Sequence, residues 1–378
     1  MKRNILFYIE ASNSPLYGGI QRVSMILAKN LIRRGYKVYS LSTSVDEKET
    51  YTESFALPEP YAKSDRNVEY IRILVKSLDI DIIIVTTSSC PATLYHFMNL
   101  GMDVKIITHY HFSPKKHYSR HYRFNGKSYS RTLLFQEIAF QYNRILLRKS
   151  HMFQDICNVS DKIVVMDKHY IREMQMLADI PKDKFAVIPN PLTYQGEMSI
   201  DMAEKEKTVL WVGRIVEEDK RISSLLNVWK LSSPNMPDWK LQIIGGGDEL
   251  EYWKSKAVEM GLVRYEFIGP TDPKSYYEKA SIYALTSNAE CWPMTLLEAM
   301  SNSCAPLLYN SYAAARSVIS DKENGILIRP YNDRRFAMAL VRLSKDEGFR
   351  KRIAANAYLK TKQYGAESIL DMWEKVFE

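Results

Sequence analysis

Asn4-Ile-Leu-Phe-Tyr-Ile9 is the first apolar run of the chain, Lys37-Val-Tyr-Ser-Leu-Ser-Thr43 is the second, and an amphipathic stretch at 19–34 lies between them. Each run has the length and composition of a strand, and the stretch between them has the spacing of a helix. Strands separated by a helix predict a βαβ unit. Because the runs lack clean alternation of apolar and polar residues, they predict a parallel sheet covered on both faces.

The alternation of predicted strands and helices continues along the chain, stops at a polar segment and then resumes in a second series. Further strands of a first series are predicted at 81–86, 104–108 and 162–165, with a helix at 131–148. After Asn190-Pro191, a polar segment without a strong period leads to Lys207. A second series then places strands at 208–212, 240–244, 265–268, 282–285 and 305–308. We therefore predict an α/β fold with two doubly wound parallel-sheet domains, whose ligand site lies at the carboxyl ends of the strands, in a cleft between the domains.

Composition narrows the class of protein. The 378 residues are 46% hydrophobic and 25% charged, as expected for globular domains with sizeable cores. A net charge of +8 suits an anionic partner, which could be a nucleotide, a lipid surface, an anionic glycan or nucleic acid. Four scattered cysteines indicate neither a disulfide framework nor a zinc knuckle. The apolar stretches are too short for a membrane helix, so we expect a cytoplasmic or peripheral protein.

The strongest motif is Glu290-Cys-Trp-Pro-Met-Thr-Leu-Leu-Glu298-Ala-Met, which follows a predicted strand and opens a helix. Pro293 suits the first helical turn. The start of a helix offers unpaired N–H groups and the positive end of its dipole, which favour a diphosphate. Glu290 precedes the helix and Glu298 lies further along it, so one carboxylate can reach a sugar and the other a ribose. The plainer alternative is a solvated carboxylate and an incidental helix pair.

Two glutamates separated by seven residues, ending in Pro-Met-Thr-Leu-Leu-Glu-Ala-Met, resemble the Glu-x7-Glu motif of glycosyltransferase family 4. The resemblance implies the GT-B fold, a nucleotide diphosphate sugar as donor and retention of anomeric configuration. It also implies that Glu290 contacts hydroxyls of the donor sugar and that Glu298 bonds the ribose hydroxyls. The backbone from Pro293 through Met294 to Thr295 would hold the diphosphate. The family usually has glycine after the first glutamate, where this chain has Cys291.

A second motif, Val212-Gly213-Arg214 with Lys220 shortly after it, ends the first strand of the second series. Fixed cations stabilise the negative charge that builds on a leaving diphosphate. By the same resemblance, Arg214 and Lys220 take that role. Arg221 stands where the family often has glycine, so it competes with Lys220 for the assignment. The alternative is a set of surface cations in an acidic loop.

Glycine-rich turns follow several of the predicted strands. Gly18 and Gly19 precede the first helix, at a place where the family has a Gly-Gly loop near the donor phosphates and the acceptor. Gly245 and Gly246 end another strand and border the nucleotide by the same resemblance, while 267–270 occupies the place where the family holds the base. Ordinary turn chemistry explains all of these glycines equally well. None fits G-x-G-x-x-G, which argues against a dinucleotide dehydrogenase.

Histidines cluster after a strand of the first series. His109 and His111 end this strand, and His117 and His121 follow. Four histidines could be drawn as a zinc site, but no carboxylate or cysteine accompanies them, so we predict no metal. In the family one histidine lies near the donor sugar and acceptor, and either His109 or His111 can take that place. Asp79-Ile-Asp81 has the letters of a metal-binding Asp-x-Asp motif but leads into a buried strand, so we expect no cofactor.

Residues 115–149 form a strongly basic stretch with a single acidic residue, Glu137. Its cations are Lys115, Lys116, Arg120, Arg123, Lys127, Arg131, Arg144, Arg148 and Lys149. Aromatic residues are interleaved with them, a pattern typical of peripheral segments at an anionic lipid surface. The stretch therefore predicts membrane contact and a lipid-linked acceptor. A solvated charged face over a core helix explains it equally well, and no nucleic-acid-binding module is recognised.

Together these patterns predict a retaining, metal-independent glycosyltransferase. We expect transfer of a hexose or N-acetylhexosamine from a UDP-sugar, with a guanosine donor as the rival, to a glycan or lipid-linked acceptor in bacterial surface polysaccharide or lipopolysaccharide synthesis. The resemblance implies an acceptor-binding domain at 1–190, completed by a crossing helix at 366–378, and a donor-binding domain at 191–365. A GT-B-fold sugar-nucleotide epimerase and a non-catalytic sugar-nucleotide-binding protein are the alternatives.

Overall fold

The computed structural model describes residues 2–15, 18–46, 49–86, 90–115, 123–124, 127–128, 133–193 and 205–378, with backbone alone at 123–124, 127–128 and 133–136. The chain forms two compact units, which we describe separately. Unit 1 comprises Met1–Thr193 and Tyr364–Glu378, and unit 2 comprises Tyr194–Gln363. The sequence placed the corresponding domain boundaries at 190/191 and 365/366.

Unit 1 is built on a seven-stranded sheet in the order β3-β2-β1-β4-β5-β8-β9, in which every pair is parallel. The strands are β1 (Asn4–Ser12), β2 (Lys37–Ser44), β3 (Glu53–Ala56), β4 (Ile80–Thr86), β5 (Lys105–Tyr110), β8 (Lys162–Val165) and β9 (Phe185–Val187). A small antiparallel pair, β6 (Arg123–Phe124) and β7 (Lys127–Ser128), lies outside this sheet. The predicted βαβ start of the chain is confirmed.

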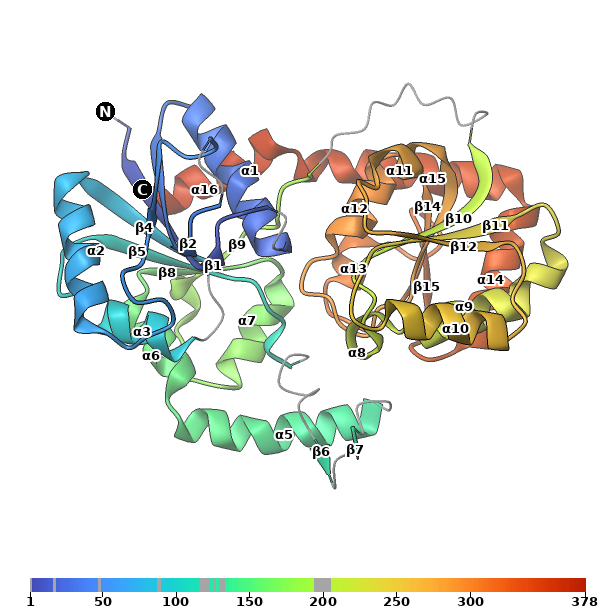
Figure 1. Cartoon of the computed structure of the whole chain (residues 1–378), viewed down its shortest axis with the longest axis horizontal. Helices are drawn as coiled ribbons and strands as arrows, with labels where there is room; N and C mark the ends of the chain where they lie inside the picture. The colour runs from blue at the N-terminus through green and yellow to red at the C-terminus, as the bar shows by residue number, and fades with distance from the viewer. Residues whose placement is uncertain are drawn as a thin grey trace. The chain divides into compact units, whose positions relative to one another are not determined.

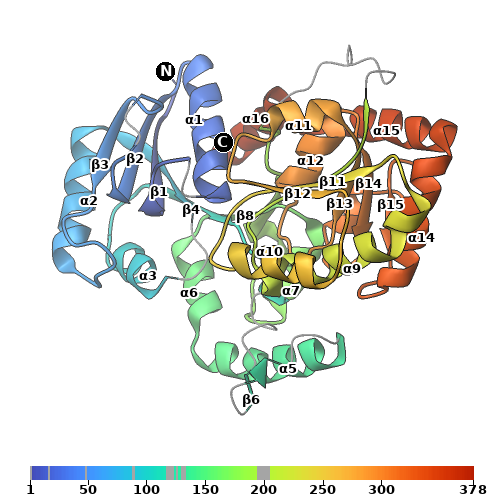
Figure 2. The same cartoon turned by 45° about the vertical axis from the view of Figure 1, so that its right-hand side comes forward.

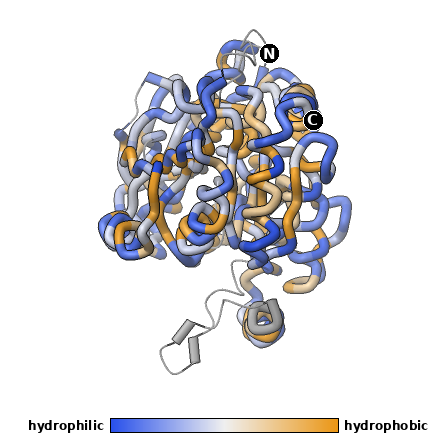
Figure 3. The backbone as a smooth tube through the Cα atoms, turned by 90° about the vertical axis from the view of Figure 1, so that its right-hand side faces the viewer, coloured by the Kyte–Doolittle hydropathy of each residue, from blue (hydrophilic) through white to orange (hydrophobic). Residues whose placement is uncertain are grey.

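Helices cover both faces of this sheet, as buried parallel strands require. In Figure 2, α1 and α2 lie on opposite sides of β1 and β2. The helices before unit 2 are α1 (Gly19–Arg33), α2 (Asp65–Ser77), α3 (Pro91–Met98), α5 (Leu133–Lys149), α6 (Met152–Val159) and α7 (Lys168–Gln175). Figure 3 shows hydrophobic stretches among the inner segments of the backbone and hydrophilic ones at many outer turns.

The last helix, α16 (Ala366–Phe377), returns to unit 1 and packs against α1 (Figure 1). Arg34, which follows α1, forms ion pairs with three carboxylates of α16, at 2.5 Å to Glu367, 2.8 Å to Asp371 and 2.7 Å to Glu374. The buried face of α16 presents Trp373 to the unit. The predicted crossing helix is therefore confirmed.

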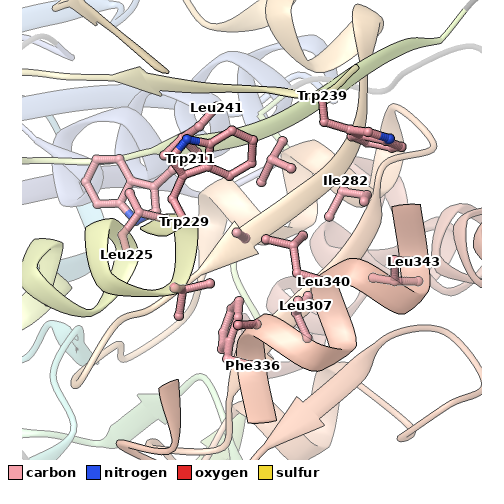
Figure 4. Packing of buried hydrophobic residues seen from close by; sticks show 14 of the residues in the cluster. Trp211, Leu225, Trp229, Trp239, Leu241, Ile282, Leu307, Phe336, Leu340 and Leu343 are labelled. Atoms are coloured by element: carbon pink, nitrogen blue, oxygen red, sulfur yellow. The ribbon is translucent and has the colours of Figure 1, made fainter. Parts of the chain in front are cut away.

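Unit 2 is built on a six-stranded parallel sheet in the order β12-β11-β10-β13-β14-β15. The strands are β10 (Glu206–Val212), β11 (Lys240–Ile244), β12 (Tyr265–Gly269), β13 (Ala280–Leu285), β14 (Ala305–Tyr309) and β15 (Ile326–Ile328). The helices are α8 (Glu217–Lys220), α9 (Ile222–Ser232), α10 (Leu250–Glu259), α11 (Lys274–Lys279), α12 (Met294–Ser301), α13 (Ala315–Val318), α14 (Asp333–Lys345) and α15 (Glu347–Thr361). Its core joins Trp211 of β10 to Trp229 of α9 and Phe336 of α14 (Figure 4).

Candidate active site

The strand order of unit 2 reverses between β10 and β13, which are parallel neighbours that continue into different halves of the sheet. Ligands of doubly wound sheets bind at such a switch point, beyond the carboxyl ends of the strands. The loops after these strands are tied together by backbone bonds. The carbonyl oxygen of Asp219 accepts from the N–H groups of Asn288 at 2.7 Å and Ala289 at 3.3 Å. The hydroxyl of Thr286 donates to the Lys220 carbonyl oxygen at 3.0 Å.

This junction brings Lys220 and Glu290 together as an ion pair between Nζ and Oε1. The hydroxyl of Ser287 also donates to Oε1 of Glu290, at 2.7 Å. The two charged side chains are only 16% and 13% exposed. A cation and a carboxylate thus stand next to each other at the switch point, largely removed from water, where electrostatic interactions are strong.

The other two cations of this region are placed differently. The side chain of Arg214 is 70% exposed and lies 3.7 Å from Asp219. Arg221 has other partners, because its guanidinium stacks on the ring of Tyr331 at 4.3 Å and its Nε donates to Ser224 at 3.1 Å. Of the two competing residues, the structure brings Lys220 to the carboxylate. Arg221 has φ 50°, a conformation that favours glycine, which gives a physical reason for the glycine usual in the family at this place.

The start of α12 is fastened to the end of β10 by Tyr283 of β13. The Tyr283 hydroxyl is hydrogen-bonded to Oγ1 of Thr295 at 2.8 Å and donates to the Val212 carbonyl oxygen at 3.2 Å. Pro293 caps the helix, and Met294 is its first residue. The positive end of the α12 dipole therefore faces the same junction as Lys220.

Cys291 stands where glycine is usual, yet its backbone is ordinary. It is absent from the described non-glycine residues that have a positive φ. A side chain is therefore accommodated at this position without strain. The Cys291 side chain is half-buried.

Glu298 lies in the second turn of α12 and is fully buried. The hydroxyl of Tyr277, which is also fully buried, donates to its Oε2 at 3.0 Å. Burial raises the pKa of Tyr277 far above its usual value, and the charge of Glu298 raises it further. Tyr277 therefore remains protonated and able to donate over the whole working pH range.

Glycines of unit 2 allow the loops after β10 and β11 to lie close together. A Cβ on Gly245, which has φ 137°, would lie 1.8 Å from the Gly213 carbonyl oxygen. The N–H of Ile215 donates to the Gly246 carbonyl oxygen at 2.8 Å. Gly213 and Gly245 thus let the chain after β10 cross the chain after β11, so packing already accounts for Gly245 without a ligand.

In unit 1, Gly18 precedes α1 in an extended conformation and Gly19 is its first residue. A Cβ on Gly19 would meet no atom within 4 Å. The start of α1 is therefore open, and steric strain does not explain Gly19. Tyr17 lies outside the described residues.

His109, in β5, and His111, just after it, are buried, and their ring centroids lie 3.9 Å apart. The ring of Trp373 meets His109 edge-on at 5.0 Å. Within the described residues, both nitrogens of His109 and Nε2 of His111 lack a hydrogen-bond partner. Burial lowers the pKa of His111 to about 3 and that of His109 well below its usual value, with His111 adding to the latter. Both imidazoles are neutral at physiological pH.

These histidines belong to unit 1, whereas Lys220, Glu290 and Glu298 belong to unit 2. Across the described ranges, no three His, Cys, Asp or Glu side chains are grouped as metal ligands. Asp81 instead accepts from the Asn4 N–H at 2.7 Å, which joins β4 to β1. His117 and His121 lie outside the described residues.

Sequence reasoning missed Tyr277, Tyr283 and Ser287. Tyr283 lies inside a buried strand and Tyr277 near the end of a short helix, so neither stands in a motif. A tyrosine in an apolar run is more often core than functional, and only the positions of the hydroxyl partners distinguish the two cases. No spacing rule in the sequence could have found them.

Two family models match the chain. The model described as Glycosyltransferase Family 4 matches residues 17–193, and the model described as Glycosyl transferases group 1 matches residues 198–360. The first falls within unit 1 and the second within unit 2.

The curated relatives include several bacterial glycosyltransferases. An uncharacterized glycosyltransferase of Haemophilus influenzae is 26% identical over 95% of this chain and 96% of the relative. A Campylobacter jejuni α-1,4-N-acetyl-D-galactosaminyltransferase, named for an undecaprenol-linked substrate, is 28% identical over 62% of each chain. The amylovoran biosynthesis glycosyltransferase AmsD of Erwinia amylovora is 27% identical over 65% of this chain and 70% of the relative.

Solved structures share the fold. Anabaena HepE in complex with UDP and glucose has a TM-score of 0.78 at 14% identity, with 99% of each chain covered. The lipopolysaccharide outer core galactosyltransferase WaaB has a TM-score of 0.71 at 18% identity, with 98% of each chain covered. With two parallel-sheet Rossmann-like units and both family models matched, the chain belongs to the GT-B glycosyltransferases of the family 4 type.

Proposed function

We propose that this glycosyltransferase moves a hexose or N-acetylhexosamine from a UDP-sugar to a hydroxyl of a glycan or lipid-linked acceptor, with retention and without a metal. The observation that carries the proposal is the Lys220–Glu290 pair beside the start of α12. The names of the relatives support the setting, since they include enzymes of undecaprenol-linked, amylovoran and lipopolysaccharide synthesis. HepE supports the donor, because its structure holds UDP and glucose.

Each group of the site fits one part of such a donor. Glu298 accepts from the ribose hydroxyls, and the first turn of α12 holds the diphosphate. Lys220 and the more exposed Arg214 stabilise the charge of the leaving diphosphate. These fixed cations take the role that a metal ion has in other enzymes. Glu290 accepts from a hydroxyl of the sugar.

In the transfer step, the bond between the anomeric carbon and the diphosphate oxygen breaks, and the acceptor oxygen bonds to that carbon on the same face. The acceptor proton passes to the leaving diphosphate oxygen, so no side-chain nucleophile is needed. Unit 1 binds the acceptor in this proposal. A neutral His109 or His111 hydrogen-bonds the sugar or acceptor and carries no charge.

A panel of nucleotide sugars tests this proposal by thermal shift and by release of nucleotide, with and without EDTA. We expect one UDP-sugar to stabilise the protein and to be hydrolysed slowly at a rate that EDTA does not change. Glu298→Ala should lose both effects, whereas Glu259→Ala, an exposed carboxylate of α10, should keep them. Stabilisation by GDP-sugars alone would show that the base of the donor is guanine and not uracil. An epimerised sugar nucleotide as product would establish the epimerase, and no stabilisation by any nucleotide sugar would contradict the proposal.

We further propose that the segment 115–149 contacts an anionic membrane, through α5. Within the described ranges, no helix has the length and apolar character to cross a bilayer. Four apolar side chains of α5 at helical spacing are 47% to 56% exposed, namely Ile138, Tyr142, Ile145 and Leu146. In Figures 1 and 2, α5 lies at the outer edge of unit 1.

Positive charge accompanies this apolar stripe. Arg144, Arg148 and Lys149 lie on the same helix, although Arg148 also pairs with Asp179 at 2.9 Å. Lys115 pairs with Glu137 at 2.6 Å. The side chains of the basic residues between 116 and 131 lie outside the described set. Anionic lipid attracts each exposed cation by about 1 kcal/mol, while apolar side chains gain by leaving water.

Sedimentation with vesicles of phosphatidylglycerol and phosphatidylcholine tests α5. We expect Ile145→Asp to weaken binding to the anionic vesicles by about 10-fold or more, because burying one isoleucine side chain gains about 1.5–3 kcal/mol. Val258→Asp is the matched control, since Val258 is an equally apolar residue of α10 that is 71% exposed. Equal binding by the two variants would contradict the proposal, and so would a concentration-dependent dimer that Ile145→Asp dissociates.

A further inference from the structure

A closed ring of hydrogen bonds surrounds Glu298. On one side, the Tyr277 hydroxyl donates to its Oε2 at 3.0 Å. On the other, the side-chain amide of Asn302 donates to the Glu298 carbonyl oxygen at 2.8 Å. Lys205 closes the ring, since its Nζ donates to the Tyr277 carbonyl oxygen at 2.9 Å and to that of Asn302. The carboxylate and the backbone of Glu298 are therefore fixed from opposite sides.

The ring is built for a carboxylate in one orientation. A carboxylate has room for about four acceptor bonds, and the Tyr277 hydroxyl fills one of them on Oε2. Tyr277 and Glu298 are both fully buried, and the Tyr277 ring lies 6.1 Å from that of Tyr283. In such a place the loss of the Tyr277 donor is costly, because water does not replace a hydrogen bond to a buried carboxylate.

We propose that Tyr277 is a positioning residue for ribose recognition, holding Oε2 of Glu298 so that the carboxylate accepts from the ribose hydroxyls of the nucleotide. This inference rests on the proposed function. Tyr277 touches Glu298 and not the substrate. It therefore sets how well the enzyme distinguishes ribose from deoxyribose, and it leaves the transfer step itself unaffected.

Calorimetric titration with UDP and with its 2′-deoxy and 3′-deoxy analogues tests the inference. We expect the wild type to prefer UDP to at least one analogue. Tyr277→Phe should weaken UDP binding about 5- to 10-fold, as expected for one hydrogen bond to a charged group, and leave that analogue almost unchanged. The ratio of the two affinities should therefore fall, with kcat at saturating donor preserved.

Tyr283→Phe is the contrasting variant, because the Tyr283 hydroxyl holds Thr295 and Val212 at the phosphate end. It should weaken UDP and the analogue equally. Lys205→Met removes the hydrogen bonds from Lys205 to the carbonyl oxygens of Tyr277 and Asn302, and it should also lower the ratio of the UDP and analogue affinities. This second variant tests the inference if Tyr277→Phe does not fold. An unchanged ratio in the folded variants, or a wild type that does not distinguish the analogues, would overturn the inference. A wild type that binds neither UDP nor GDP overturns the proposed function instead.

Discussion

On the proposed function, we expect Lys220→Met to lower kcat for sugar transfer by on the order of 10²- to 10³-fold, the loss typical of removing one preorganised group that stabilises transition-state charge. The ammonium of Lys220 is fixed by Glu290 at the switch point of unit 2 and is largely shielded from water. No reorganisation is needed when charge develops on the leaving diphosphate. Donor binding should weaken less than kcat falls, because that charge is largest in the transition state. Steady-state kinetics with the donor found in the nucleotide-sugar panel measures both quantities.

The matched control is Arg221→Met, which removes the neighbouring cation. Because the Arg221 guanidinium stacks on Tyr331, we expect kcat to stay within about 10-fold of the wild type. Lys220→Met also removes the cation beside the partly buried carboxylate of Glu290, which costs stability, at most about the 3–5 kcal/mol of a fully buried broken pair. The double variant Lys220→Met/Glu290→Gln should regain stability but not activity. Recovery of activity in the double variant would show that Lys220 serves only to hold Glu290.

Unit 1 should lose stability as the pH falls below about 6.5, the ordinary pKa of histidine. In the unfolded chain, His109 and His111 take up protons near that pH, but in the folded unit burial lowers the pKa of His111 to about 3 and that of His109 well below its usual value. Protons then bind mainly to the unfolded state and stabilise it. Each histidine removes about 1.4 kcal/mol per pH unit from the free energy of unfolding, and for His111 the loss continues until about pH 3.

Hydrogen exchange of β5 peptides between pH 7 and pH 5, corrected for the intrinsic exchange rate, measures this loss of unfolding free energy. Most carboxylates stay ionised in this pH range, so the histidines dominate the change. His111→Leu should reduce the slope by about 1.4 kcal/mol per pH unit. His96 is a third buried histidine with a lowered pKa and should contribute to the slope that remains. The control is His151→Asn, an exposed residue with φ 57°, a conformation that asparagine tolerates. A wild-type stability independent of pH in this range would contradict the prediction.

Much of the fold could be predicted because buried parallel strands leave a plain signal. The apolar runs before Gly213 and Gly245 mark strand ends, and the structure ends β10 and β11 at Val212 and Ile244. Three edge strands, β3, β9 and β15, were not predicted. They are only four, three and three residues long, too short for any period to show.

The site was predictable only where a motif fixes the chain locally. The spacing of Glu290 and Glu298 places one glutamate in a loop and the other on a helix. The choice between Lys220 and Arg221 needed the structure, because the two residues are adjacent, Lys220 as the last residue of α8 and Arg221 as its C-cap, and only the three-dimensional structure shows Arg221 stacked on Tyr331. The burial of His109 could not be foreseen either, since the Trp373 ring that covers it comes from the far end of the sequence.

The position of α16 bears on how the chain is made. Ribosomes deliver residues in order, and domains generally fold as units, the first ones first. Here the partner of Arg34 in unit 1 is a helix that emerges only after all of unit 2. Unit 2 can thus finish while unit 1 still exposes the apolar surface that Trp373 will cover. A chain that ends within unit 2 therefore has all the strands of the sheet of unit 1 but lacks the helix that covers it.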